Sequence, residues 1–163
     1  MHDSADAFWT ATRERLDAEF AGELPRFFDG LPAAHLHSVE EVLAGGKRLR
    51  GGLVCLLNEA FGGAASAAVP RAMAVECVQA ATLIHDDLVD GDTLRRDHAA
   101  TWTEQGPRRA VLLADLMFAT ALNRMAQLGR EDVLALAEAI ATMAAGAYQG
   151  PLAPADLARS PDG

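Results

Sequence analysis

The stretch from Pro70 to Asp90 constrains this chain most, because an apolar segment runs directly into three carboxylates, Asp86, Asp87 and Asp90. Proline fits the first turn of a helix and Gly91 should end it, so the spacing predicts one long helix over 70–90. On that helix Asp86 and Asp90 lie one turn apart, and Asp87 lies three residues before Asp90. The three acids repel one another, and they stand at the helix end where the macrodipole disfavours anions.

Two interpretations of this acidic cluster are open. The plainer one is a solvated helix end that leads into a loop, which is the commoner outcome for a short acidic motif taken alone. The other is a cation site, because Mg²⁺ prefers oxygen ligands and often joins carboxylates to substrate phosphates. Arg95 and Arg96 follow closely, and guanidinium groups bind phosphate oxygens through paired hydrogen bonds. The segment therefore indicates a site for a metal-bound phosphorylated ligand.

A second unusual segment reads Gly45-Gly46-Lys47-Arg48-Leu49-Arg50. Its glycines let the backbone approach a ligand closely or adopt positive φ. Lys47 supplies a point charge and Arg50 a planar fork, and the helix that they open could add its first amides to an anion site. Ordinary surface basic residues after a glycine helix stop are the alternative. Together, the acidic and basic segments suggest one ligand held by metal and another, or another part, held by cations.

Packed helices are the expected architecture. Half of the 163 residues are hydrophobic and only 6% are aromatic, and alanine and leucine are plentiful, which favours helices over sheets. We expect one all-α domain over 1–163, a helical bundle whose residues 151–163 form a frayed tail. The first expected helix is capped by Ser4, runs to about Leu24, where Pro25 interrupts it, and places Phe8, Leu16 and Phe20 on its inner side. Besides 70–90, the other expected helices run from a capping box at Ser38 to Gly45, from about Arg50 to Phe61, from Pro107 to about Leu128 and from Arg130 to about Tyr148. Residues 91–106 are expected to form a polar loop.

Charge and composition exclude several classes. The net charge of −9 argues against binding to nucleic acid or anionic membrane surfaces. Cys55 and Cys77 lie in apolar runs without metal-ligand spacing, so we expect buried free thiols. The sequence shows no apolar signal region and no run long and uncharged enough to be a transmembrane segment, so a soluble cytoplasmic protein is expected.

Three motifs together resemble the trans-isoprenyl diphosphate synthases, also called polyprenyl synthetases. They are the segments 45–50, 83–90 and 92–96, and they occur in the family's order, with a resemblance that runs from about residue 38 to about residue 150. The resemblance implies the first half of that family's all-α fold. It also implies a prenyltransferase of isoprenoid biosynthesis, which condenses an allylic diphosphate with isopentenyl diphosphate and depends on Mg²⁺.

The resemblance also assigns roles to residues. The family's catalytic group would correspond to Asp86, Asp87 and Asp90, which would hold Mg²⁺, and to Arg95, which would contact the allylic diphosphate. His85 receives no catalytic role. The residues that would hold isopentenyl diphosphate are Lys47, Arg50, Gln79 and Arg96.

Product length in this family depends partly on bulk just before the first aspartate. Ala81 and Thr82 stand there and are small, which resembles members whose products have geranylgeranyl length or more. The alternative is that these small residues merely allow close helix packing.

The sequence also departs from the family. A second aspartate-rich motif is missing, Ala114-Asp115 stands where relatives often carry Gly-Asp, and Gly51 stands where proline is usual. We expect the N-terminal part of a longer synthase, one subunit of a heteromer, or a chain that self-associates. Each case predicts exposed apolar helix faces and an obligate homo- or hetero-oligomer or a marginally stable fold.

Two other functions stay open at this stage. One is a non-catalytic subunit that binds diphosphates and regulates a heteromeric synthase. The other is a fragment of a class I terpene cyclase, which shares the aspartate motif. The basic segment at Lys47 to Arg50 argues against the cyclase, because a cyclase needs no isopentenyl diphosphate site.

Overall fold

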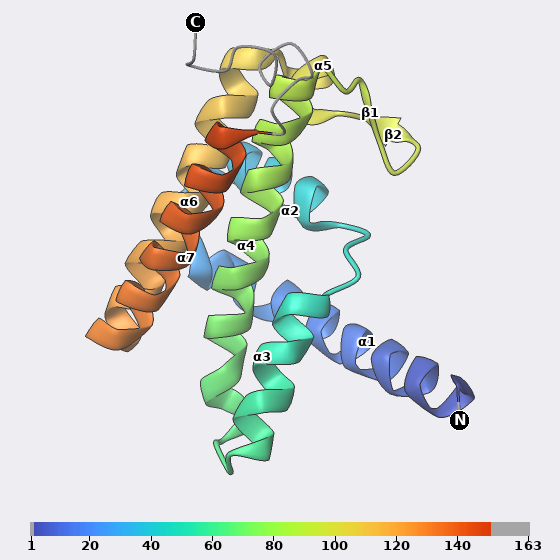
Figure 1. Cartoon of the computed structure of the whole chain (residues 1–163), viewed down its shortest axis with the longest axis vertical. Helices are drawn as coiled ribbons and strands as arrows, with labels where there is room; N and C mark the ends of the chain where they lie inside the picture. Colours follow the sequence, from blue (N-terminus) through green and yellow to red (C-terminus); the bar gives the residue numbers. More distant parts are fainter. Residues whose placement is uncertain (1, 151–163) are drawn as a thin grey trace, which may run out of the picture.

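The computed structural model describes residues 2–150, apart from the side chains of residues 2–5 and Phe8. Within these residues the chain forms seven helices and one two-stranded ribbon, so the all-α prediction is confirmed (Figure 1). The expected frayed tail, 151–163, lies outside the described residues, and the single domain over 1–163 stays a prediction. The elements are α1 (His2–Phe27), α2 (Ala33–Leu43), α3 (Leu49–Ala60), α4 (Ala65–Asp90), β1 (Leu94–Arg95), β2 (His98–Ala99), α5 (Thr101–Gln105), α6 (Pro107–Leu128) and α7 (Arg130–Gln149).

The long helix α4 forms the centre of the bundle. It packs mainly against α6 on one side and α3 on the other, while α1 leads away from the bundle toward the N-terminus (Figure 1). Alanines that are completely buried, among them Ala72, Ala81, Ala114 and Ala121, let α4 approach its neighbours α3 and α6 closely. The predicted inner residues Leu16 and Phe20 of α1 are buried, and both cysteines are buried free thiols as expected.

The predicted bounds of α1 are wrong at both ends. The helix begins at His2, before Ser4, and it continues through Pro25 to Phe27. A proline so near the end of a helix removes few backbone hydrogen bonds. Tertiary contacts then hold the last turn: Phe27 is buried, and Arg124 of α6 donates to the carbonyl of Phe27 at 2.6 Å.

Two other helix starts also differ from the prediction. Helix α2 begins at Ala33, directly after Pro32, so Ser38 lies inside the helix and its hydroxyl donates to the Ala34 carbonyl at 3.4 Å rather than capping the helix. Helix α4 begins at Ala65, and Pro70 lies inside it. The end of α4 is as predicted, because Gly91 adopts φ +73° as its left-handed cap.

The predicted polar loop over 91–106 contains structure. Strands β1 and β2 pair antiparallel around Arg96 and Asp97, both of which adopt positive φ, the backbone of a type I′ turn. Helix α5 follows, and the Trp102 indole donates to the Asp92 carbonyl at 2.7 Å. This loop is therefore fixed against the end of α4.

Apolar side chains are exposed on the outer faces of the bundle, as predicted for a chain that packs against another part of a longer protein or against a second subunit. They include Leu53 and Leu57 on α3, Phe61 directly after it, Leu112 on α6, and Leu134, Met143 and Tyr148 on α7. Helix α4 is long and apolar enough to cross a membrane by length and composition, but 56% of its most apolar window is buried inside the bundle. Its apolar character therefore matches that of a core helix.

Candidate functional site

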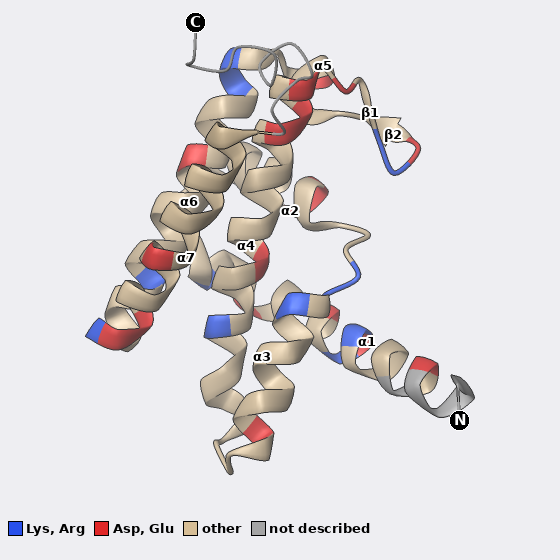
Figure 2. Cartoon of the chain, in the orientation of Figure 1, with Lys and Arg blue, Asp and Glu red and all other residues tan. Residues whose placement is uncertain are grey.

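One face of α4 is left open by the packing. Residues one turn apart along it are half-buried or exposed, whereas those on the opposite side pack into the core. The open residues are Gln79, Leu83, Asp86 and Asp90. Figure 2 shows acidic residues, coloured red on the helix, gathered at the end of α4 nearest α5. Two of the predicted metal ligands, Asp86 and Asp90, are therefore accessible to a ligand.

The third aspartate, Asp87, points the other way. Its side chain is 5% exposed and lies against Arg95 of β1, whose Nε donates to Asp87 Oδ2 at 3.1 Å and whose Nη2 donates to Asp87 Oδ1. The hydrogen bond to Asp87 raises the pKa of Arg95 above its usual value, partial burial opposes the rise, and the charges of Asp87, Asp92 and Asp86 add to it. The predicted catalytic Arg95 is therefore held by a predicted metal ligand.

The donor set suits Mg²⁺ in its chemistry, since it offers only carboxylate oxygens. In the part of the chain that the structure describes, no three His, Cys, Asp or Glu side chains are grouped to hold a metal ion. The reason is local, because Asp87 turns inward to Arg95 while Asp86 and Asp90 face solvent. Metal binding by all three aspartates stays a prediction.

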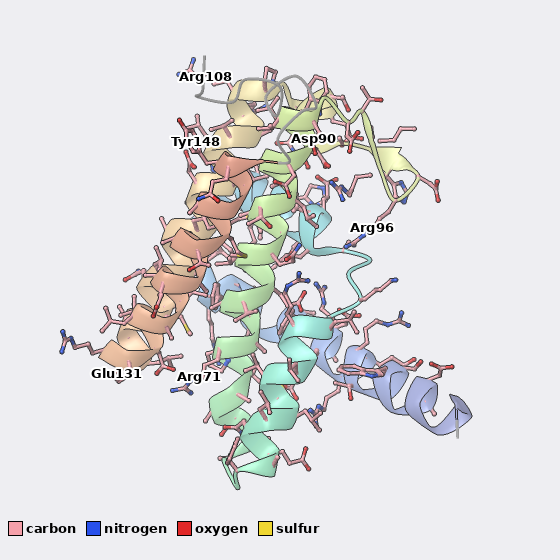
Figure 3. All side chains as sticks on the ribbon, viewed as in Figure 1. Arg71, Asp90, Arg96, Arg108, Glu131 and Tyr148 are labelled. Atoms are coloured by element: carbon pink, nitrogen blue, oxygen red, sulfur yellow. The ribbon has the colours of Figure 1, made fainter. Side chains whose placement is uncertain are left out.

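The arginine turn meets the glycine segment. Arg96 Nη1 donates to the Ala44 carbonyl at 3.4 Å, next to Gly45, which adopts φ +68°. Figure 3 labels Arg96, which lies on the side of the β1–β2 hairpin that faces the glycine segment, and Asp90, which lies at the end of α4. A pocket of about 590 Å³ lies between α2, α4, α5 and the ribbon, and its lining includes Gly45, Asp87, Arg95 and Arg96. Two sequence motifs 50 residues apart thus share one pocket.

The other predicted cations lie outside that pocket. Lys47 and Arg50 are exposed around the start of α3, and Gln79 is half-buried on the open face of α4. A second pocket of about 590 Å³ lies between α1, α4 and α6 around Phe27, Met73 and Arg124, and it contains none of the predicted site residues.

The two predicted chain-length residues have different surroundings. Ala81 is completely buried in the core, so it does not line the open face of α4. Thr82 is half-buried, and its hydroxyl donates to the Gln79 carbonyl at 2.8 Å. His85 faces α6, with its ring 5.7 Å from that of Phe118 and a buried Nε2 that lacks a hydrogen bond.

Sequence reasoning missed a buried polar cluster beside the basic segment. Arg48 is 7% exposed, its Nε donates to Asp17 Oδ1 at 2.7 Å, and its guanidinium lies 5.2 Å from the ring centre of Phe20. Glu76 of α4 is also buried and accepts a 2.7 Å hydrogen bond from the Gly51 amide. A signal was available, because Glu76 is the only acid between Arg71 and Asp86, and a buried carboxylate needs a partner.

Known proteins resemble this chain in sequence and in structure. The family model for polyprenyl synthetase matches residues 33–152. Geranylgeranyl diphosphate synthase of Methanosarcina mazei is 39% identical over 93 residues, which cover 57% of this chain and 29% of that protein. The large subunit 1 of the heterodimeric chloroplastic geranylgeranyl pyrophosphate synthase of Arabidopsis thaliana is 40% identical over 95 residues, covering 57% of this chain and 26% of that one.

A solved structure agrees with these matches. Polyprenyl synthase from Caulobacter crescentus CB15, complexed with calcium and isoprenyl diphosphate, superposes with a TM-score of 0.73 at 30% identity over 86% of this chain and 44% of that chain. The chain thus spans less than a third of the two curated relatives and under half of the solved one. With a family model that matches most of its length and a shared fold, the chain belongs to the polyprenyl synthetase family, as its three motifs predict.

Proposed function

We propose that this chain forms the aspartate- and arginine-bearing wall of a prenyltransferase that joins an allylic diphosphate to isopentenyl diphosphate. The observation that carries the proposal is the shared pocket, in which Arg95, Arg96 and Asp87 meet the glycine segment at Gly45. Cations suited to phosphate oxygens and carboxylates suited to a divalent cation lie together there. The family match supports the same reaction class.

Arg95 and Asp87 make the site responsive to its ligand. When Arg95 turns to an allylic diphosphate, the buried carboxylate of Asp87 loses its partner and needs another positive charge. Asp86, Asp87 and Asp90 would then hold Mg²⁺, which neutralises the charge on the leaving diphosphate. One solved relative is complexed with calcium and isoprenyl diphosphate, which supports the pairing of a divalent cation with a prenyl diphosphate in this proposal.

Isopentenyl diphosphate is assigned to the cations beside this pocket. Lys47 and Arg50 are exposed, Arg96 lies at the glycine segment, and Gln79 stands two turns before Asp86 on the open face of α4. Of the two chain-length residues, the half-buried Thr82 is placed better than Ala81 to limit a growing product, and products of geranylgeranyl length or longer remain our proposal.

The open face of α4 favours a partner. Gln79, Asp86 and Asp90 lie along a face of α4 that the other described residues leave half-buried or exposed, and large apolar side chains are exposed on α3, α6 and α7. We propose that the chain works as a homo- or hetero-oligomer in the cytoplasm, and the heterodimeric relative supports the second arrangement. The second candidate function is a non-catalytic subunit that binds diphosphates. It is favoured because Asp87 faces Arg95, so that the three aspartates are not grouped to hold a metal ion in the described residues.

Product formation and ligand binding separate these functions. Radiolabelled isopentenyl diphosphate is incubated with Mg²⁺ and an allylic primer, with the chain alone and with a candidate partner subunit. Labelled prenyl product supports the transferase, whereas Mg²⁺-dependent diphosphate binding without product supports the regulatory subunit. Asp86→Ala and Asp90→Ala should weaken this binding, whereas Glu138→Ala, an exposed acid of α7, should not. Unchanged affinity in both aspartate variants would refute the site.

A further inference from the structure

We infer that Arg48 and Glu76 are positioning residues that fix the first turn of α3, and with it Lys47 and Arg50, for binding the diphosphate of isopentenyl diphosphate. The inference rests on the proposed function and extends it to two residues that contact no substrate. Both are buried, at 7% exposure each, whereas Lys47 and Arg50 are exposed. The basic segment thus contains one buried cation, Arg48, and two exposed cations, Lys47 and Arg50, that can bind an anion.

Glu76 caps α3 from another helix. Arg48 stands at the N-cap position of α3 but makes no capping hydrogen bond through its side chain. The amide of Gly51, the third residue of the helix, instead donates to Glu76 Oε1 at 2.7 Å. The first amides of a helix lack internal partners, and its N-terminus favours a negative charge, so this carboxylate fills the role of an N-cap. The bond ties the start of α3 to the centre of α4.

Arg48 holds the backbone just before that cap. Its φ of +52° is unusual for a residue other than glycine and persists where surrounding contacts impose it. Three contacts do so: the 2.7 Å bond to Asp17, the approach to Glu76 Oε2 at 3.9 Å, and the Phe20 ring. With two carboxylates and a ring around it, this guanidinium is not available to a phosphate.

Gly51 makes the cap possible in this chain. Gly51 supplies the backbone N–H that this cap requires, which a proline at the same position would lack. A Cβ at Gly51 would also lie 3.0 Å from Glu76 Cγ and 3.4 Å from Ala72 Cβ, so the two helices approach closely here. The N–H of Gly51 binds the Glu76 carboxylate, and the lack of a side chain at Gly51 leaves room for that carboxylate beside the helix. Cations on a turn held in this way bind an anion without first having to be ordered.

The test compares two arginines in the full chain. Arg48→Met removes the inferred positioning cation. Arg71→Met is the matched control, because Arg71 of α4 also makes a short ion pair, at 2.6 Å to Asp132 of α7, but away from the basic segment. Affinity for isopentenyl diphosphate is measured by calorimetry without Mg²⁺, and amide hydrogen exchange is followed over 46–52. Glu76→Met, which removes the acceptor of the Gly51 amide, is the second variant, used if Arg48→Met does not fold.

We expect Arg48→Met, or Glu76→Met in its place, to weaken binding by about tenfold and to speed exchange over 46–52, while Arg71→Met changes neither. A folded variant with wild-type affinity and wild-type exchange over 46–52 would overturn the inference. Loss of affinity with unchanged local exchange would overturn it too, because the turn would not have loosened. If the wild-type chain binds no isopentenyl diphosphate, the proposed function fails, and with it the positioning role, even where exchange shows that the two residues hold the turn.

Discussion

Replacing Arg95 by glutamine should destabilise the fold as well as the site. The change leaves Asp87, whose side chain is 5% exposed, as a buried carboxylate without its partner. Removing one member of a fully buried ion pair costs about 3–5 kcal/mol. Arg95 is 36% exposed, so water reaches this pair and takes up part of the loss, and we expect about 2 kcal/mol. For a chain of this size the melting temperature should then fall by about 4–8 °C.

The assay is urea unfolding of Arg95→Gln, Asp87→Asn and the double variant. Asp87→Asn removes the buried charge that Arg95→Gln leaves without a partner. The free energy of unfolding lost in the double variant should therefore be smaller than the sum of the two single losses by about 1 kcal/mol. Arg96→Gln is the matched control: Arg96 is exposed and donates a 3.4 Å hydrogen bond to the Ala44 carbonyl, so its loss should change stability by less than about 0.5 kcal/mol. Additive losses, or an unaffected Arg95→Gln variant, would refute the ion pair.

Three further predictions concern packing and burial. Gly52→Ala should cost about 1–3 kcal/mol in urea unfolding, because the new Cβ would lie 2.7 Å from Trp9 Cζ3. Gly146→Ala should instead stabilise α7 by about 0.5–1 kcal/mol in the same assay, since nothing lies within 4 Å of its added Cβ. Burial raises the pKa of the Cys77 thiol from 9.0 to about 12, so the folded state keeps a proton that the unfolded state releases between these values. Stability should therefore fall as pH rises above 9, less steeply in Cys77→Ala, and at pH 8 native Cys77 should resist alkylation until urea is added.

Elements with signals at both ends could be predicted from the sequence. Pro107 opens α6, a glycine separates it from α7, and both helices run almost as expected. The end of α1 and the starts of α2 and α4 could not be predicted in the same way. Proline and serine are local signals for helix ends, whereas Pro25, Ser38 and Pro70 all lie inside helices. Packing of the surrounding apolar residues outweighed the cost of one lost backbone hydrogen bond.

The acidic motif shows how far residue types alone can locate a site. Its chemistry and spacing singled out Asp86, Asp87 and Asp90, but not the direction in which each points. Each helical residue advances about 100° around the axis, so extending the buried face of α4 from Cys77 through Ile84 leads to Asp87 and leaves the other two outside. This division was accessible from the apolar periodicity. The identity of the partner was not, because Arg95 and Arg96 are adjacent and the turn between the strands decides which of them faces Asp87.

The cluster around Glu76 marks a firmer limit. A lone acid inside an apolar helix requires a donor, and Lys47, Arg48 and Arg50 were all candidates in the sequence. The choice depends on two backbone facts, the positive φ of Arg48 and the hydrogen bond that the Gly51 amide donates to Glu76, and neither follows from residue type. Residue type alone does not show that Arg48 is buried while Lys47 and Arg50, the two ligands that the resemblance assigns, are exposed. The tertiary cap therefore decides which charges of this segment remain available for an anion.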